Sequence, residues 1–466
     1  MSKPIKFMFF DYWDYEYVRG FQRRLGQPRK SADNPILVAT LPWEHNCMHL
    51  YGTVLKDPID GLFKMWYSVW GEHRDFYILY ATAQDGHHWT RPELDVVPGT
   101  NIVMPAELHP IGPTVIVDVA EPDPSRRYKA MMRPVGTVVI NAYISRDGIH
   151  WKLAQEEPVI VAPSDAHIGL YRDPQTGIYH CSFRLFGCDR RVWRSESEDF
   201  VHWRRPVLGI EPVVEDRGRI HIYNMQMTPY GNYVMGWLSV LYTEEWDLHY
   251  GKCQGTMDVQ LAHSRDGYCW HRTAIGEKFI PLGAPGAWDS GLVSPSSGPV
   301  LLSDEMLFYY SGRPYGHGEL HPEIPEGLGV ASLRPDGFLA LHAGEGPGQL
   351  MTRPFAVREP GLYVNADATQ GQVRVALCEG SSAKPFQGFT FEDCRPLCGS
   401  GSTQQVTWAG NPDPTIMVNR PIRVALRAQR ADVYSVTLTN GNDPARYWEF
   451  RELVANDPMD NLVRDF

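Results

Sequence analysis

Four acidic residues stand just before apolar stretches that read as strands, and carboxyl groups in such positions can carry acid–base chemistry. They are Glu44, Asp165, Glu215 and Asp289. Cleavage of a glycosidic bond needs two carboxyl groups with different pKa values, one to donate a proton and one to attack carbon or activate water. These four residues are the candidate catalytic groups. The alternative for each is a carboxylate that caps a loop or is simply solvated.

Polar and aromatic side chains near these acids could bind sugar hydroxyls. The candidates are Trp43, His49, His167, Arg184, His221, Tyr223, Asn224, Arg313 and His317. A single histidine is more often a structural residue than a ligand. No histidine spacing indicates zinc, so no metal ligand is assigned. The eight cysteines form no C-x-x-C pair and predict free thiols in a reducing compartment.

An internal repeat supplies the elements that must position these groups. A strand, then Ser-x-Asp, then Trp four residues after the Asp recurs, as in YATAQDGHHW and YISRDGIHW. Four copies end at Trp89, Trp151, Trp203 and Trp270, and a weaker fifth contains Asp336 without a Trp. The Asp is expected to accept backbone N–H bonds in a turn, and the Gly to adopt positive φ. We interpret Asp, Gly and Trp here as structural.

A second repeated feature is a hairpin turn, D-P-x-x-G, at Asp57 and at Asp173. Together the two features define a four-stranded blade and predict an all-β fold, a five-bladed β-propeller over residues 1–345. The blades are expected at 41–105, 106–160, 161–210, 211–280 and 281–345, with residues 1–40 supplying a closing strand. Short alternating segments, including FQGFTFEDC, predict a β-sandwich at 350–441, and the tail 442–466 has helical spacing.

The propeller places the candidate acids. The first strand of each blade lines the central channel, so residues just before that strand are expected to face the pocket. Glu44 would belong to blade 1, Asp165 to blade 3, Glu215 to blade 4 and Asp289 to blade 5. Four acids from four blades could converge on one substrate.

The repeated Asp–Trp turn and the C-terminal sandwich resemble the five-bladed glycoside hydrolases of families 32, 43 and 68. The segments PWE, YGTVLKD, FKMWY and SRDG are most similar to bacterial proteins described only as family-32-like glycosyl hydrolases. The resemblance implies a glycoside hydrolase for a furanoside, such as a fructoside or arabinoside, or a transglycosylase of that type. It implies a small carbohydrate or oligosaccharide as substrate and no cofactor, and it allows a structural Ca²⁺ in the central channel.

Two departures from family 32 bear on the site. The W-M-N-D-P-N-G segment that holds the family's nucleophile is absent, and its nearest equivalent, 41–46, offers Glu44 in place of Asp. The family's R-D-P motif is matched by Arg172, Asp173 and Pro174. However, the continuation mirrors the hairpin at Asp57, so we expect Asp173 in a turn away from the pocket.

Other functions stay open. A propeller that lost its acids would be a carbohydrate-binding protein, and a glycoside phosphorylase could use Arg184 and Arg313 to hold phosphate. A sialidase-like hydrolase is a third alternative. The chain has a net charge of −11 and no Lys/Arg run, which argues against nucleic acid. No signal peptide and no apolar stretch of about 18 residues is seen, so we expect a cytoplasmic protein that has no membrane partner. Homo-oligomerisation is left open.

Overall fold

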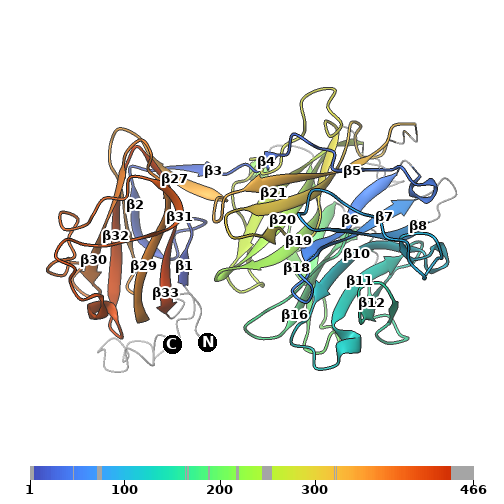
Figure 1. The fold of residues 1–466 in the computed structure, drawn as a ribbon, viewed down its shortest axis with the longest axis horizontal. Coiled ribbons are helices and arrows are strands. Elements are labelled where there is room, and N and C mark those ends of the chain that lie inside the picture. Colours follow the sequence, from blue (N-terminus) through green and yellow to red (C-terminus); the bar gives the residue numbers. More distant parts are fainter. Residues whose placement is uncertain are drawn as a thin grey trace. The chain divides into compact units, whose positions relative to one another are not determined.

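The structure is a computed structural model. It describes residues 5–45, 47–70, 76–162, 164, 167–186, 189–216, 220–243, 254–319, 321 and 323–441. In these ranges the regular structure is β-strand with a few short 3-10 turns, and no helix there is long and apolar enough to cross a membrane. The chain divides into two compact units, residues 27–333 and residues 1–26 with 334–466. Figure 1 shows both units as sheets.

Residues 27–333 form five antiparallel blades, each begun by an inner strand. Blade 1 contains β6 (Met48–Lys56), β7 (Phe63–Trp70), β8 (Phe76–Ala83) and β9 (Ile102–Met104). Blade 2 contains β10 (Pro110–Val117), β11 (Tyr128–Pro134) and β12 (Val139–Ser145), with β13 (Trp151–Leu153) and β14 (Ile160–Val161) both paired to β12. Blade 3 contains β15 (Gly169–Arg172), β16 (Tyr179–Phe186), β17 (Arg190–Ser197) and β18 (Val207–Ile210).

The last two blades follow the same order, and one parallel pair, Met257 with Leu292, joins them into a ten-stranded sheet. Blade 4 contains β19 (Ile220–Tyr230), β20 (Tyr233–Thr243), β21 (Gly255–Ser264) and β22 (Trp270–Arg272). Blade 5 contains β23 (Leu292–Pro295), β24 (Val300–Leu301), β25 (Met306–Arg313) and β26 (Gly327–Leu333). Two N-terminal strands, β4 (Arg29–Lys30) and β5 (Leu37–Val38), pair with β26 and complete blade 5. The predicted closing strand is thus confirmed.

Buried hydroxyl groups close the five blades into a ring. At every junction a serine or threonine side chain bonds to the neighbouring blade, and we call this set the hydroxyl ring. Thr53 donates to Pro113 O (3.3 Å), Thr114 to Ile168 O, Ser182 to Met225 O (2.6 Å) and Ser296 to Gly52 O (3.0 Å), while Ser239 Oγ and Ser294 Oγ lie 3.1 Å apart. The bonds run from blade 1 through blade 5 and back to blade 1, which confirms the five-bladed propeller.

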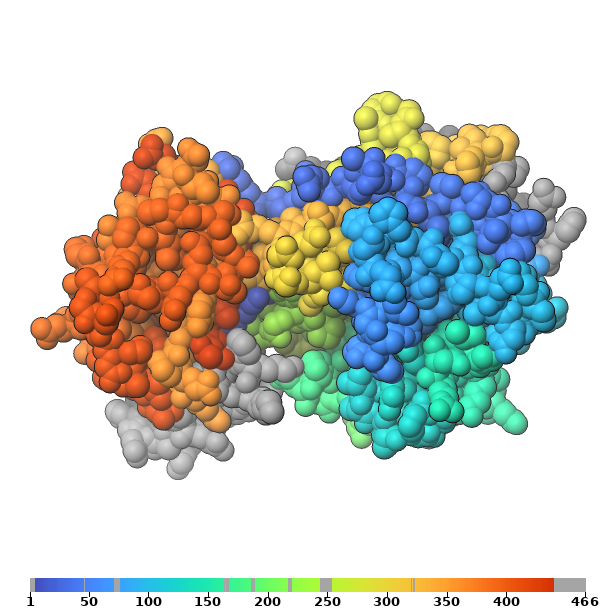
Figure 2. All heavy atoms as spheres, in the orientation of Figure 1, coloured from blue at the N-terminus to red at the C-terminus, as the bar shows by residue number. Residues whose placement is uncertain are grey.

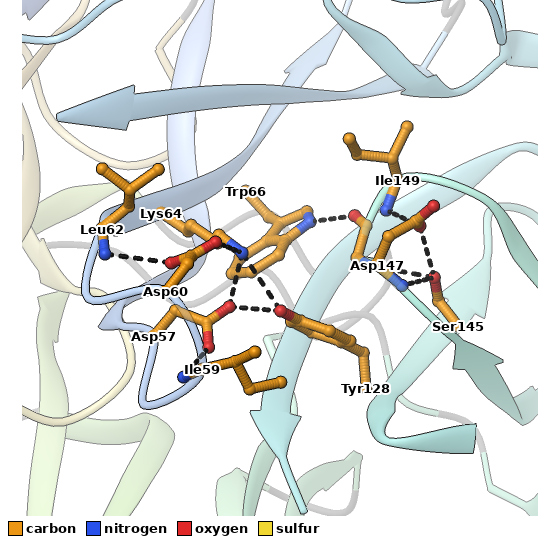
Figure 3. Close-up of polar contacts among 11 residues, drawn as sticks. Asp57, Ile59, Asp60, Leu62, Lys64, Trp66, Tyr128, Ser145, Asp147 and Ile149 are labelled. Atoms are coloured by element: carbon orange, nitrogen blue, oxygen red, sulfur yellow. Dashed lines mark hydrogen bonds and ion pairs between the residues drawn. The ribbon is translucent and has the colours of Figure 1, made fainter. Parts of the chain in front are cut away.

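The repeated Asp turns are structural, as predicted. In blade 2, Asp147 accepts the backbone N–H of Ile149 at 2.8 Å, and Ser145 bonds to the same carboxylate (Figure 3). The backbone N–H of His150 donates to it as well, at 2.9 Å. Gly148 has φ of +80°, and its carbonyl accepts the Trp151 indole N–H at 2.9 Å. The third copy has Phe200 at φ +74° in the glycine position. These residues hold the turn in its conformation, so we assign them a structural and not a catalytic role.

A buried lysine joins blade 1 to blade 2 (Figure 3). Lys64 Nζ lies 2.5 Å from Asp57, 2.7 Å from Asp60 and 3.1 Å from the Tyr128 hydroxyl of blade 2. Tyr128 also donates to Asp57, and the Trp66 indole N–H donates to the turn of blade 2 at Gly148 O (2.7 Å). Figure 2 shows the two blades as adjoining blue and cyan surfaces.

The same arrangement recurs between blades 2 and 3. Asp118 accepts the Tyr179 hydroxyl, and Lys129 lies 3.7 Å from Asp118 and 2.7 Å from Glu121. Asp173 occupies the corresponding place in blade 3, where its carboxylate accepts the backbone N–H of Gln175 at 2.7 Å. Asp173 therefore lies in the hairpin turn between β15 and β16, as the match to Asp57 predicts.

The second unit has two antiparallel sheets. One holds β1 (Ile5–Phe7), β3 (Gln22–Leu25), β27 (Leu339–Ala343), β29 (Val357–Asp367), β31 (Ser400–Gln405) and β33 (Ala431–Gly441). The other holds β2 (Tyr15–Arg19), β28 (Gly348–Thr352), β30 (Gln372–Glu379) and β32 (Ile422–Gln429). Burial alternates along β28, so one side of this sheet is covered, as a sandwich requires.

Three expectations differ from the structure or lie outside it. Residues 1–26 and 334–345, expected in the propeller, belong to the second unit, because β3 pairs with β27 and β2 with β28. The predicted strand in FQGFTFEDC is wrong: this segment forms turns that bury Phe386 and Phe389. The tail 442–466, predicted to be helical, lies outside the described residues.

We predict that Lys64→Met lowers the free energy of unfolding by about 3 kcal/mol, because it leaves the buried Asp57 without its cation. Burial raises the pKa of Asp57, but Lys64 and Tyr128 outweigh it and the net pKa is lowered. The stabilisation is therefore present above about pH 4 and lost as pH falls. Urea unfolding at pH 7 and at pH 3 measures this. Lys152→Met, at an exposed site, is the control, and equal stability of the two variants at pH 7 contradicts the prediction.

Candidate active site on the propeller axis

The ends of strands from several blades meet at one end of the propeller axis. Inner strands start there, second strands end there and third strands start there again, because neighbouring strands are antiparallel. Eight side chains from these ends form what we call the axial cluster. They are His49, Tyr51, His167, Arg184, Tyr223, Arg313, His317 and Glu326. Apart from His317, none is more than 8% exposed.

Glu326 is the carboxylate of the axial cluster. Its Oε1 accepts hydrogen bonds from Arg313 at 2.9 Å and from the Tyr315 hydroxyl at 3.0 Å. Oε2 lies 3.7 Å from His49 Nδ1, and no donor of the described chain forms a hydrogen bond to this oxygen. Burial raises the pKa of Glu326, but His49 and Arg313 outweigh it and the pKa is lowered. Glu326 is therefore ionised at neutral pH.

Aromatic rings connect Glu326 to the opposite side of the axis. His49 meets the edge of Tyr51 at 4.0 Å between ring centroids and lies 5.3 Å from Trp70, while Tyr51 stacks on His167 at 5.7 Å. His167 Nε2 lies 3.0 Å from Thr114 Oγ1 of the hydroxyl ring. Burial lowers the pKa of His49, and it lowers the pKa of His167 to about 3. Both imidazoles are neutral at pH 7.

Tyr223 lies among cationic and hydrogen-bonding groups. Its hydroxyl is 3.1 Å from His317 Nε2, and its side chain packs with Tyr51 in one buried cluster. The guanidinium carbons of Arg184 and Arg190 lie 4.2 and 5.2 Å from its ring centroid. Burial raises the pKa of Tyr223, but the two arginines and Tyr51 outweigh it and the net pKa is lowered. For Tyr51, burial and Tyr223 raise the pKa.

The structure brings together six of the nine predicted binding residues, namely His49, His167, Arg184, Tyr223, Arg313 and His317. His221 lies beside them, where its Nδ1 accepts the backbone N–H of Arg190 at 3.1 Å. Burial lowers the pKa of His221 to about 4. Asn224 bonds to Ser239 at 3.0 Å within the hydroxyl ring, and the Trp43 indole donates to Asn101 at 2.8 Å inside blade 1.

Glu44 does not open onto the axis as expected. It ends a 3-10 turn, Pro42–Glu44, which directs its carboxylate back into blade 1. Oε2 accepts the backbone N–H groups of Thr40 and Leu41 at 2.8 and 3.0 Å. Oε1 accepts the Tyr67 hydroxyl at 2.8 Å and pairs with Arg91 at 2.7 Å. The Glu44 carboxylate is thus bound by four groups of the protein, through three hydrogen bonds and one ion pair.

The other predicted acids also lie apart from the axial cluster or outside the described chain. Asp289 is buried 2.6 Å from Lys30 and accepts the Tyr310 hydroxyl at 3.2 Å, so it anchors the closing strand β4. Glu215 is exposed in the 3-10 turn Val214–Asp216. Asp165 lies outside the described residues, and its catalytic role stays a prediction.

Sequence reasoning missed Glu326 and Tyr51. Glu326 directly precedes β26, the third strand of blade 5, and third strands start at the same end as inner strands. A search for acids before third strands would have found it. Tyr51 lies inside β6, two residues after His49, so the alternation of side chains along that strand places both toward the axis.

No group of three metal-ligating side chains occurs in the part of the chain that the structure describes. The channel Ca²⁺ that the resemblance allows stays a prediction.

We predict that Glu44→Gln acts on stability. The amide would place a donor against groups that all donate, so the free energy of unfolding should fall by about 3 kcal/mol. Thermal and urea unfolding measure this, with the exposed Glu93→Gln as the control. A variant with unchanged stability and abolished activity would instead make Glu44 catalytic.

Comparison with known proteins gives similar structures but no family. No family model matches the sequence, and no curated protein matches it. A glycosyl hydrolase of Bacteroides ovatus aligns at TM-score 0.47 and 14% identity over 67% of this chain and 95% of its own. A β-1,2-mannobiose phosphorylase of Listeria innocua aligns at 0.47 and 12% over 66% and 97%, and an α-L-arabinofuranosidase of Podospora anserina at 0.45 and 12% over 67% and 98%. These similarities assign neither a family nor an activity to this chain, and the family-32-like resemblance stays a prediction.

Proposed function

We propose that this protein is a carbohydrate-active enzyme that cleaves a glycosidic bond at the axial cluster. The observation that carries the proposal is Glu326, a buried, ionised carboxylate on the axis of a propeller, with one oxygen free of hydrogen-bond donors from the described chain. A carboxylate held in this way can take a proton from an attacking water or from a sugar hydroxyl.

The neighbours of Glu326 support this role. Arg313 and Tyr315 fix Oε1, so the direction of Oε2 is set before a ligand arrives. The rings of Tyr51 and Trp70 both contact His49, which faces Glu326, and aromatic rings suit the apolar faces of a sugar ring. Asp165, placed before the inner strand of blade 3 in the sequence, remains the candidate for a second carboxyl group. A furanoside is the first substrate class to test, because the sequence resemblance implies it.

Phosphorolysis is the second candidate, and one observation favours it. Arg184, Arg190 and Arg313 bring three guanidinium groups to the axial region. Guanidinium groups are suited to holding phosphate, which would then replace water as the attacking group. Hydrolase and phosphorylase differ in whether cleavage depends on phosphate.

We predict that Glu326→Gln lowers turnover by about a hundredfold, the scale expected when a positioned base is removed. The assay is a panel of aryl furanosides and pyranosides, each with and without inorganic phosphate. Glu323→Gln, an exposed carboxylate three residues away, is the control and should retain full turnover. Thermal unfolding of both variants separates lost chemistry from lost folding.

Each outcome decides between the functions. Release of free sugar without phosphate supports the hydrolase, and phosphate-dependent formation of a sugar 1-phosphate supports the phosphorylase. Binding of sugars without turnover on any substrate would make the protein a carbohydrate-binding propeller. Full activity of a folded Glu326→Gln variant would remove Glu326 from the mechanism.

A further inference from the structure

We propose that Tyr223 is the proton donor of this reaction, a buried phenol in the role that a carboxylic acid usually fills. The inference rests on the proposed function and concerns the same axial cluster. It assigns the acid that protonates the leaving group.

The position of Tyr223 is the first argument. It lies near the start of β19, an inner strand, so its hydroxyl belongs to the end of the axis where the cluster is built. The hydroxyl is 3.1 Å from His317 Nε2, and the side chain packs with Tyr51, whose ring contacts His49. His49 in turn faces Glu326 at 3.7 Å. Tyr223 and Glu326 therefore occupy the two ends of one chain of contacting side chains.

The charge around Tyr223 is the second argument. Among the described residues, the titratable groups that face it come from six elements: Tyr51 on β6, Arg133 on β11, Arg184 on β16, Arg190 on β17, His221 on β19 and His317 in the connection after β25. The arginines are cations and no carboxylate of the described chain contacts the phenol. Negative charge that develops on the phenol oxygen during proton transfer is stabilised by charges already in place.

Glu326, His49 and His167 of the axial cluster do not offer a proton at neutral pH. Glu326 is ionised, and the pKa values of His49 and His167 are both lowered by burial. Tyr51 keeps its proton, because burial and Tyr223 raise its pKa. Compared with these four groups, Tyr223 is the one whose proton is both present and made easier to release.

The step balances with water as the attacking group. The Tyr223 O–H bond breaks and its proton joins the glycosidic oxygen, while the C1–O bond breaks and its electron pair passes to that oxygen. A lone pair of water forms the new C1–O bond, and this water loses a proton to Glu326 Oε2. Tyr223 then regains a proton from solvent and Glu326 releases one, so that water is added across the glycosidic bond.

Leaving-group dependence tests the acid role. A dinitrophenyl glycoside needs no proton on its leaving oxygen, whereas an alkyl glycoside does. Tyr223→Phe should lose about a hundredfold or more on the alkyl substrate and little on the dinitrophenyl one, the scale of general acid catalysis. Glu326→Gln should lose equally on both. Equal loss of Tyr223→Phe on both substrates would make Tyr223 a structural residue and overturn the proposal.

A titration gives a readout independent of activity. Absorbance at the tyrosinate band is followed against pH for the wild type, Tyr223→Phe and the exposed Tyr12→Phe. The difference between wild type and Tyr223→Phe should show one phenol that ionises below pH 10, which Tyr12→Phe retains. Tyr51→Phe should raise the pH at which this phenol ionises. Ionisation of Tyr223 above pH 10 would overturn the proposal even in an active enzyme.

The two proposals can fail separately. If no glycoside is cleaved by the wild type, the proposed function fails, and the acid role falls with it even where the titration finds an acidic phenol. If glycosides are cleaved through Glu326 and Tyr223→Phe shows no dependence on the leaving group, only the acid role fails.

Discussion

Closure of the ring at the axis constrains everything else in the propeller. The inner strands of blades 1 to 4 are edge strands, so half of their backbone N–H and C=O groups have no partner within their own sheet, while β23 of blade 5 makes one parallel pair with β21. The hydroxyl ring supplies partners from the next blade, as when Ser182 donates to Met225 O or Ser296 to Gly52 O. Space is short there: a Cβ on Gly169 would lie 2.4 Å from Met225 O, so only small side chains fit where the strands converge.

Beyond the hydroxyl ring, toward the starting ends of the inner strands, larger polar side chains find room, and antiparallel order decides which of them meet. Arg184 and Arg313 lie near the ends of second strands, and Tyr51 and Tyr223 lie near the starts of inner strands. Glu326 directly precedes a third strand. Buried guanidinium groups need compensation, which Glu326 gives to Arg313 directly. The axial cluster is thus a consequence of ring closure together with strand direction.

The difference between bonds within a few residues and bonds set by tertiary structure explains what the sequence could predict. The Asp–Trp turns and the D-P-x-x-G hairpins bond within a few residues, so their pattern was enough to predict five blades. Glu44 and Asp289 also stand before inner strands, but their partners are set by tertiary structure: Arg91 for Glu44, and for Asp289 Lys30, 259 residues away. Nothing local marks such pairs. Six of the predicted binding residues lie together at the end of the axis where inner strands start, whereas Glu326 was not among the predicted acids because only inner strands were considered.

The positive charge of the arginines at the axis also determines which kind of side chain can donate a proton there. In a cationic, buried site a carboxyl group loses its proton, as Glu326 does beside Arg313, and an imidazole stays neutral, as His49 and His167 do. Neither type is then a proton donor at neutral pH. A phenol starts from a much higher pKa, so the same positive charges lower its pKa toward neutral pH and still leave its proton in place. The guanidinium groups that make carboxyl groups and imidazoles unsuitable as acids are therefore what makes Tyr223 suitable.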